Sequence, residues 1–154
     1  MDAKIYKYQN EIDELISLGC QLPELFPPND ISAFRFAYSD FKKQSHVPQY
    51  MSNPRRMLQD ISKNRMTISL LALSCFDTAA HAETFYVNLK KAFRNISSTI
   101  GDSLSEGVLT NNDGMKTINN SNGHFDFYEY EGCDLNNTFQ IIKDLNADEK
   151  DKRI

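Results

Sequence analysis

The sequence contains few cysteines, no tryptophan and no apolar run long enough to cross a membrane. Its three cysteines, Cys20, Cys75 and Cys133, form no C-x-x-C pair, which argues against a disulfide framework or a zinc knuckle and favours a reducing compartment. The longest apolar run, residues 66–76, is far below the roughly 20 residues of a membrane span. The N-terminal residues mix charge into every turn, unlike a signal peptide. These absences predict a cytoplasmic protein that does not associate with the membrane.

Common catalytic and nucleotide-binding motifs are missing as well. Neither the G-x-S-x-G serine motif, nor the phosphate-binding loop, nor G-x-G-x-x-G occurs. The three histidines, His46, His81 and His124, share no metal-binding spacing, and the pair His124-x-Asp126 supplies too few ligands for a zinc site. Cys75 lies near the end of the apolar run and close to an expected helix start, which fits an activated thiolate or, more commonly, an inert buried thiol. The sequence therefore predicts neither a metal nor a cofactor.

Charge is distributed unevenly along the chain. The 154 residues carry a net charge of −4 and are 40% hydrophobic and 25% charged, which is typical of one globular domain spanning residues 1–154. Residues 42–94 hold nine Lys/Arg against three Asp/Glu, whereas the remainder holds eight against eighteen. Such asymmetry indicates either a partner-binding surface or two sets of charges that complement each other inside one fold.

The apolar run at residues 66–76 predicts the central strand of a sheet. Both of its alternating sets of side chains are apolar, a pattern typical of a strand covered on both faces, although a buried helix is the alternative. Residues 33–38 alternate aromatic and smaller side chains and predict a second strand. Residues 78–98 predict a long helix whose apolar stripe, including Phe85 and Leu89, packs on this sheet.

Two shorter helices are expected in the N-terminal half. An amphipathic pattern predicts a helix over residues 3–19, with a glycine as its final residue. The segment 20–32 has three prolines within six residues, so it is an extended connector. Residues 39–53 are polar and turn-rich, and the proline that follows them is suited to open a helix over residues 54–64.

Alternation and turn motifs predict a three-stranded antiparallel meander in the C-terminal half. The expected strands cover residues 103–109, 115–118 and 124–131. The dipeptide Asp113-Gly114 between the first two is a strong hairpin motif. Consecutive strands joined by short turns usually pair with each other, so the meander follows from the spacing.

The last segment completes the predicted fold. Asp134 is expected to cap a helix that ends at residue 145, and residues 146–154 form a charged tail. The body of the domain, residues 33–145, is then an α+β fold with a mostly antiparallel sheet of about five strands. The long helix packs across the sheet, and a further helix lies toward each end of the chain.

Arg35 on the second strand, Ser74 in the central strand, and Glu129 and Glu131 on the last strand occur in a suggestive order. This order resembles that of the arginine-type ADP-ribosyltransferase toxins, although the family's Ser-Thr-Ser stretch appears here as Leu73-Ser74-Cys75, without the threonine and the second serine. The resemblance implies NAD as cofactor, held by Arg35 and Ser74. It also implies that Glu131 stabilises an oxocarbenium-like sugar and that Glu129 orients the acceptor. Alternatively, these residues have only structural roles. Arg35 is then exposed, Ser74 is a core serine hydrogen-bonded to the backbone, and Glu129 and Glu131 are carboxylates on an edge strand.

Basic side chains on two expected helices supply a second candidate site. Arg55 and Arg56 begin one helix, where cations oppose the helix dipole and are better suited to meeting an acidic partner. Lys90, Lys91 and Arg94 lie on the long helix. The leading hypothesis is a small protein-interaction or regulatory module, a component of a bacterial multi-protein system that acts without a cofactor. A protein partner or a homo-oligomer is expected, and nucleic acid is less favoured because the whole chain is acidic.

Overall fold

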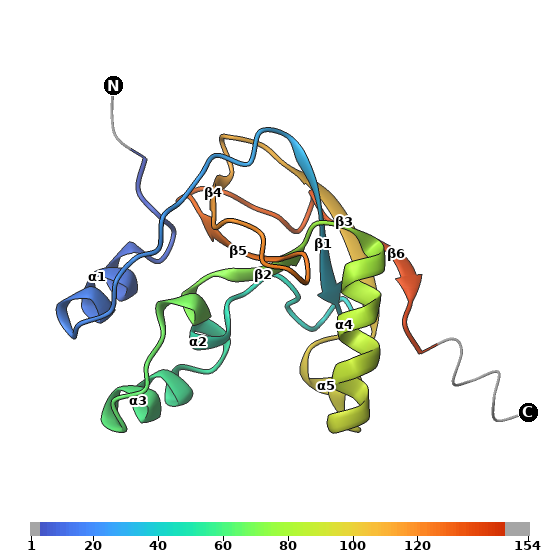
Figure 1. Ribbon diagram of the computed structural model, residues 1–154, viewed down its shortest axis with the longest axis horizontal. Helices are drawn as coiled ribbons and strands as arrows, with labels where there is room; N and C mark the ends of the chain where they lie inside the picture. Colours follow the sequence, from blue (N-terminus) through green and yellow to red (C-terminus); the bar gives the residue numbers. More distant parts are fainter. Residues whose placement is uncertain (1–3, 147–154) are drawn as a thin grey trace, which may run out of the picture.

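A six-stranded antiparallel sheet forms the centre of the computed structural model, which describes residues 4–146 (Figure 1). The strand order is β4-β5-β2-β1-β3-β6. The sheet curls, because a short turn at residues 110–113 joins β3 to β4 although the two strands are far apart in this order. The fold is therefore α+β, as predicted, with one strand more than expected. The strands are β1 (Ile31–Ala37), β2 (Leu73–Phe76), β3 (Ser103–Leu109), β4 (Gly114–Lys116), β5 (His124–Glu129) and β6 (Gln140–Asp144).

Helices cover one face of the sheet in two separate groups (Figure 1). The first group, here called the α3 lobe, packs around Tyr128 of β5 and contains α1 (Gln9–Ser17), α2 (Gln49–Ser52), α3 (Pro54–Ser62) and the 3₁₀ helix η1 (Ile68–Leu71). The second group, the α4 lobe, packs on aromatic side chains of β1 and β2 and contains α4 (Ala79–Ala92) and α5 (Ile96–Thr99). Among the described residues, no helix is long and apolar enough to cross a bilayer.

The other face of the sheet lies inside the curl and holds its own core. Alternation along β2 and β5 directs Leu73, Cys75, Phe125 and Phe127 to this inner face, where all four are buried. Phe139, just before β6, packs against the same cluster. The face toward the helices is called the outer face, and its side chains on β2 and β5 come from the intervening positions.

The N-terminal helix begins later than predicted, at Gln9 instead of residue 3. The preceding residues pair with the end of β5: the Lys7 amide donates to the Glu129 carbonyl at 2.8 Å, and the Glu131 amide donates to the Ile5 carbonyl at 2.9 Å. These backbone hydrogen bonds to a distant segment replace the first helical turns. The predicted end of the helix is confirmed, because Gly19 adopts φ 109°, which favours glycine.

The predicted strand over residues 66–76 is only partly correct. Thr67 caps η1 through the Ser69 amide, and this single turn buries Ile68 and Leu71 against α1. Only the last four residues form β2, which nevertheless lies between β5 and β1 inside the sheet. The two buried residues Ile68 and Leu71 are three positions apart, which is the period of a 3₁₀ helix. Because most residues of the run are apolar, the sequence pattern did not distinguish this turn from a strand.

The long helix is also shorter than predicted and presents a different residue to the core. α4 ends at Ala92 because Phe93 is extended, with φ −133° and ψ 111°, and α5 is a separate turn. Tyr86, which is 2% exposed, is the large buried side chain of α4, whereas Phe85 is 39% exposed. The expected helix over residues 54–64 is confirmed as α3, with Asn53 capping the Arg56 amide.

The C-terminal half contains the largest correction. The helix predicted after Asp134 is absent from the described residues, where a turn at residues 135–138 leads into β6. β6 pairs with the free edge of β3, which also pairs with β1, so the expected meander is reduced to the hairpin of β4 and β5. The predicted tail, apart from Asn146, lies outside the described residues.

Candidate functional site

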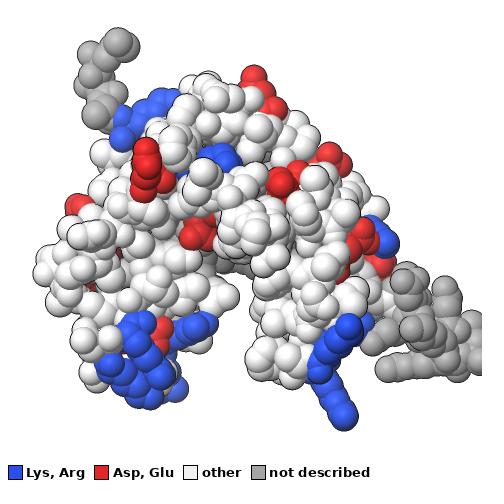
Figure 2. Space-filling view, viewed as in Figure 1, with Lys and Arg blue, Asp and Glu red and all other residues white. Residues whose placement is uncertain are grey.

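A hollow open to solvent separates the α3 lobe from the α4 lobe (Figure 2). The two lobes cover opposite ends of the outer face, so the strands between them form the roof of the hollow. Lys and Arg side chains gather at the free end of each lobe in the same view. The sequence predicted one basic surface from these helices, and the structure instead places its members on both sides of the hollow.

The free end of the α3 lobe is basic, and part of its charge is unpaired. Arg56 and Arg65 lie 3.7 Å and 3.4 Å from the buried carboxylate of Asp60. Arg55 and Lys63 are exposed and have no ion-pair partner among residues 4–146. Since no acidic side chain lies in the first turn of α3, two arginines there oppose the helix dipole without compensation.

The end of the α4 lobe repeats this composition. Lys91 and Arg94 are exposed and form no ion pair within the described part of the chain, and Lys90 lies over the Tyr86 ring. Each lobe also carries a large exposed apolar side chain in its basic segment. Leu58 of α3 is 67% exposed, and Phe93 after α4 is 58% exposed.

Three polar side chains line the roof of the hollow. In the register of β2 and β5, Ser74 lies opposite Asp126 and Phe76 lies opposite His124. Ser74 Oγ is 2.6 Å from His124 Nε2, and Asp126 Oδ1 is 3.8 Å from the same nitrogen. Burial lowers the pKa of His124 and raises the pKa of Asp126. From the sequence, His124 and Asp126 are only an incomplete set of metal ligands, and no pattern indicates that they lie beside Ser74.

Arg35 lies on the inner face and is 7% exposed, so its side chain is separated from that of Ser74 by the sheet. Its guanidinium donates to the Ser74 carbonyl, to the Ser45 carbonyl at 3.1 Å and to His46 Nδ1 at 3.1 Å. Burial, with the nearby arginine, lowers the pKa of His46 to about 3. The guanidinium of Arg35 is therefore hydrogen-bonded to other residues of the protein. Arg35 is also buried, so the alternative prediction of an exposed arginine is wrong.

Glu129 is buried on the inner face and is paired with the N-terminal segment. Lys7 Nζ lies 2.7 Å from Glu129 Oε2 and also donates to the Cys133 carbonyl. The other oxygen, Oε1, is buried without a hydrogen-bond partner among the described residues. Burial raises the pKa of Glu129, although the Lys7 ammonium opposes this shift.

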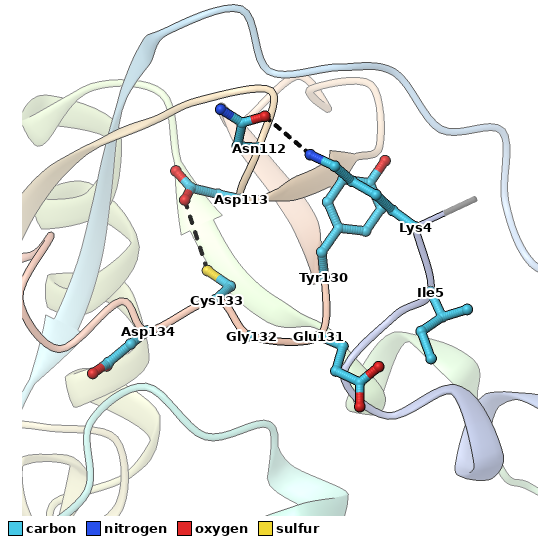
Figure 3. Close-up of a pocket in the computed structure, with 9 residues that line it drawn as sticks. All are labelled: Lys4, Ile5, Asn112, Asp113, Tyr130, Glu131, Gly132, Cys133 and Asp134. Carbon is cyan, nitrogen blue, oxygen red and sulfur yellow. Dashed lines mark hydrogen bonds between the residues drawn. The ribbon is translucent and has the colours of Figure 1, made fainter. Parts of the chain in front are cut away.

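Glu131 follows the end of β5 and is exposed at a separate pocket of about 570 Å³ (Figure 3). Lys4 reaches over the Tyr130 ring in this pocket, and Figure 3 shows the Glu131 carboxylate directed away from Asp113 and Cys133. Arg35 does not line the pocket. The four residues that resemble the ADP-ribosyltransferase motif therefore do not meet in one cavity, and this geometry gives the resemblance no support.

The cysteines are free thiols. Burial raises the pKa of Cys75 to about 11 and that of Cys133 to about 12, so both are protonated at neutral pH and poor nucleophiles. Residues 4–146 contain no group of three or more His, Cys, Asp or Glu side chains suited to hold a metal ion. The most distinctive surface of the described chain is the hollow with its two basic lobes and polar roof.

Comparison of the chain with protein-family models, with curated proteins and with solved structures finds no match.

Proposed function

We propose that this chain is a protein-binding module that holds an acidic segment of a partner protein in the hollow between the α3 lobe and the α4 lobe. The observation that carries the proposal is the repeated composition of the two lobe ends. Each combines a cation that forms no ion pair within residues 4–146 with an exposed large apolar side chain: Arg55 with Leu58 on one lobe, and Arg94 with Phe93 on the other. Protein interfaces commonly join apolar anchors to a charged rim in this way.

The charge of the lobes determines the chemistry of the partner. Opposite potentials on two surfaces steer their encounter and set their register, so cations on both sides of a hollow favour an acidic segment between them. The remainder of the chain is strongly acidic and repels such a partner elsewhere, which restricts binding to this face. A regulatory role inside a multi-protein system fits a module that binds through a surface and needs no cofactor.

Protein is a better partner for the hollow than nucleic acid. Polyphosphate backbones are bound by continuous clusters of cations. Here the two basic ends lie apart, on either side of the hollow (Figure 2). The strands between them carry the carboxylate of Asp126, opposite Ser74 in the register. The exposed side chains of Leu58 and Phe93 have no role in phosphate binding, whereas they are suitable anchors for an apolar surface on a protein.

Binding to the partner recovered by co-purification from the native host tests the proposal. Arg55→Glu/Arg56→Glu and Lys91→Glu/Arg94→Glu should each weaken that complex by at least about tenfold, because like charges then face each other. Lys42→Glu/Lys43→Glu is the matched control, since it reverses two adjacent charges in the loop outside the lobes. Cross-links from both lobes to one acidic segment are expected.

Three results would overturn the proposal. The first is equal binding of the partner by the lobe variants and the loop control. The second is a set of cross-links that maps to a single lobe, and the third is recovery of a nucleic acid as the partner. A complex consisting only of copies of this chain, measured by light scattering, would replace the acidic partner with self-association.

A further inference from the structure

The roof of the hollow contains a serine and a histidine in direct contact. Ser74 Oγ and His124 Nε2 are 2.6 Å apart, at the short end of the range for hydrogen bonds made by hydroxyl groups. The two residues are held by neighbouring antiparallel strands, and His124 lies two residues from Asp126, the register partner of Ser74, on the same face of the sheet. The sheet itself therefore fixes their separation. The contact is thus built on rigid elements, which position side chains more accurately than loops.

The surroundings keep the imidazole in its basic, uncharged form. His124 is partly buried, with its ring edge-on to Phe76 at 5.4 Å. This burial and the positive charge of Arg35 lower its pKa, and Asp126 opposes them only in part. A neutral imidazole has one nitrogen with a free lone pair, and the short contact places the serine hydroxyl beside Nε2.

Ser74 is also accessible from the solvent. Its neighbours in β2, Leu73, Cys75 and Phe76, are all buried, whereas Ser74 is exposed between the two lobes. A serine that served only as a hydrogen-bond partner for the partly buried histidine would not need this exposure. Accessibility from the hollow combined with contact to a neutral base is the arrangement that activates a serine nucleophile.

We propose that Ser74 is a nucleophile activated by His124 and that it takes an acyl group from an activated ester entering the hollow. Ser74 Oγ forms a bond with the acyl carbon, and the bond from that carbon to the leaving oxygen breaks. The hydroxyl proton moves to His124 Nε2 and from there to the departing alkoxide or phenoxide. The products are acyl-Ser74 and the free alcohol or phenol, so atoms and charge balance without a cofactor.

Asp126 does not occupy the position, relative to the imidazole, of the acid in a Ser-His-Asp triad. In such a triad the acid binds the imidazole nitrogen opposite to the serine. Here its oxygen lies 3.8 Å from the same nitrogen that contacts Ser74. Asp126 therefore stabilises the imidazolium by charge during transfer and does not orient the ring. The acylation step itself requires only Ser74 and His124, and it does not rest on the proposed partner binding.

Reaction with p-nitrophenyl acetate tests the proposal. One equivalent of p-nitrophenolate should be released, with a single acetyl group added to the intact protein and mapped to Ser74 by peptide mass spectrometry. Ser74→Ala should abolish the adduct. His124→Gln should slow acetylation about 100-fold, because general bases contribute about 10²–10⁴ in rate. Ser32→Ala is the matched control and should react like the wild type, since Ser32 is an exposed strand serine with no hydrogen bond to histidine among the described residues.

Two outcomes would overturn the proposal. One is acetylation of Ser74 at the same rate in the wild type and in His124→Gln. The other is acetylation confined to lysines or to the N-terminus, with no adduct on Ser74. Far-UV circular dichroism identifies any variant that fails to fold, and in that case His124→Asn is used as the second test of the base.

Discussion

The core face of α4 provides the sharpest test of the fold. Tyr86 is 2% exposed, its ring centroid lies 5.2 Å from that of Phe36, and its hydroxyl donates to the Gly101 carbonyl at 2.9 Å. Truncating a large buried aromatic side chain costs about 3–5 kcal/mol. We therefore expect Tyr86→Ala to lower the free energy of unfolding by that amount, and Tyr86→Phe by about 1 kcal/mol through loss of the hydrogen bond.

The neighbouring residues supply the comparison. Phe85 is 39% exposed, so about three-fifths of its surface is buried and Phe85→Ala should cost about 2 kcal/mol. Val87 is 54% exposed, and Val87→Ala should cost less than about 1 kcal/mol. For a domain of this size, about 1 kcal/mol corresponds to about 2–4 °C in melting temperature.

Urea unfolding followed by circular dichroism measures these differences, since the chain has no tryptophan for fluorescence. The expected order of destabilisation is Tyr86→Ala, then Phe85→Ala, then Val87→Ala. If Phe85→Ala is as costly as Tyr86→Ala, the assignment of the buried face of α4 is wrong, and the stripe predicted from the sequence alone is the correct one.

Two further predictions concern a buried carboxylate and a helix cap. The pKa of Glu129 is raised above its ordinary value of 4.5 mainly by burial, so the folded state binds this proton more tightly than the unfolded state. The stability of the wild type relative to Glu129→Gln should therefore fall as the pH rises from below 4.5 through the raised pKa, and a difference independent of pH would contradict this. Asn53→Ala should cost about 1 kcal/mol, because Asn53 Oδ1 accepts from the Arg56 amide at the start of α3. Asn53→Asp should retain the cap, and equal melting temperatures for both variants would show that the cap contributes nothing.

Local patterns in the sequence predicted the elements whose cause is local. The proline after Asn53 and the glycine at position 19 mark helix ends through the backbone angles that these residues prefer. The alternation along residues 124–131 predicted a strand, and β5 covers most of this range, His124–Glu129. In each of these cases the decisive interaction lies within a few residues of the pattern itself.

The failures have causes that are distant in the sequence. The segment 134–145 has an apolar spacing that is typical of a helix. Residues 140–144 nevertheless form a strand, because they pair with the free edge of β3. Likewise, residues 5–7 pair with the end of β5, more than a hundred positions away in the chain. Pairing with a remote strand overrides the weak helical preference of short segments.

The candidate site was only partly predictable for the same reason. Ser74 was selected from the sequence, but its partner was not, because the register that brings His124 beside it depends on the pairing of β2 with β5. The position of Arg35 on the opposite face from the aromatic side chains follows from alternation. The burial of Arg35 by contact with the loop that carries His46 could not be predicted, because no sequence pattern indicates that contact.

The strand order has a consequence for how the chain is made. The two innermost strands, β1 and β2, are synthesised first, whereas their outer neighbours β3 and β5 begin only at Ser103 and His124. A nascent chain emerging from the ribosome therefore exposes the open edges of its innermost strands for most of translation. Folding must close long loops before these edges are paired, and non-local pairing of this kind is slow and prone to aggregation. The hairpin of β4 and β5, whose strands are joined by residues 117–123, can form locally once both strands are made, but it joins the sheet only when β5 pairs with β2.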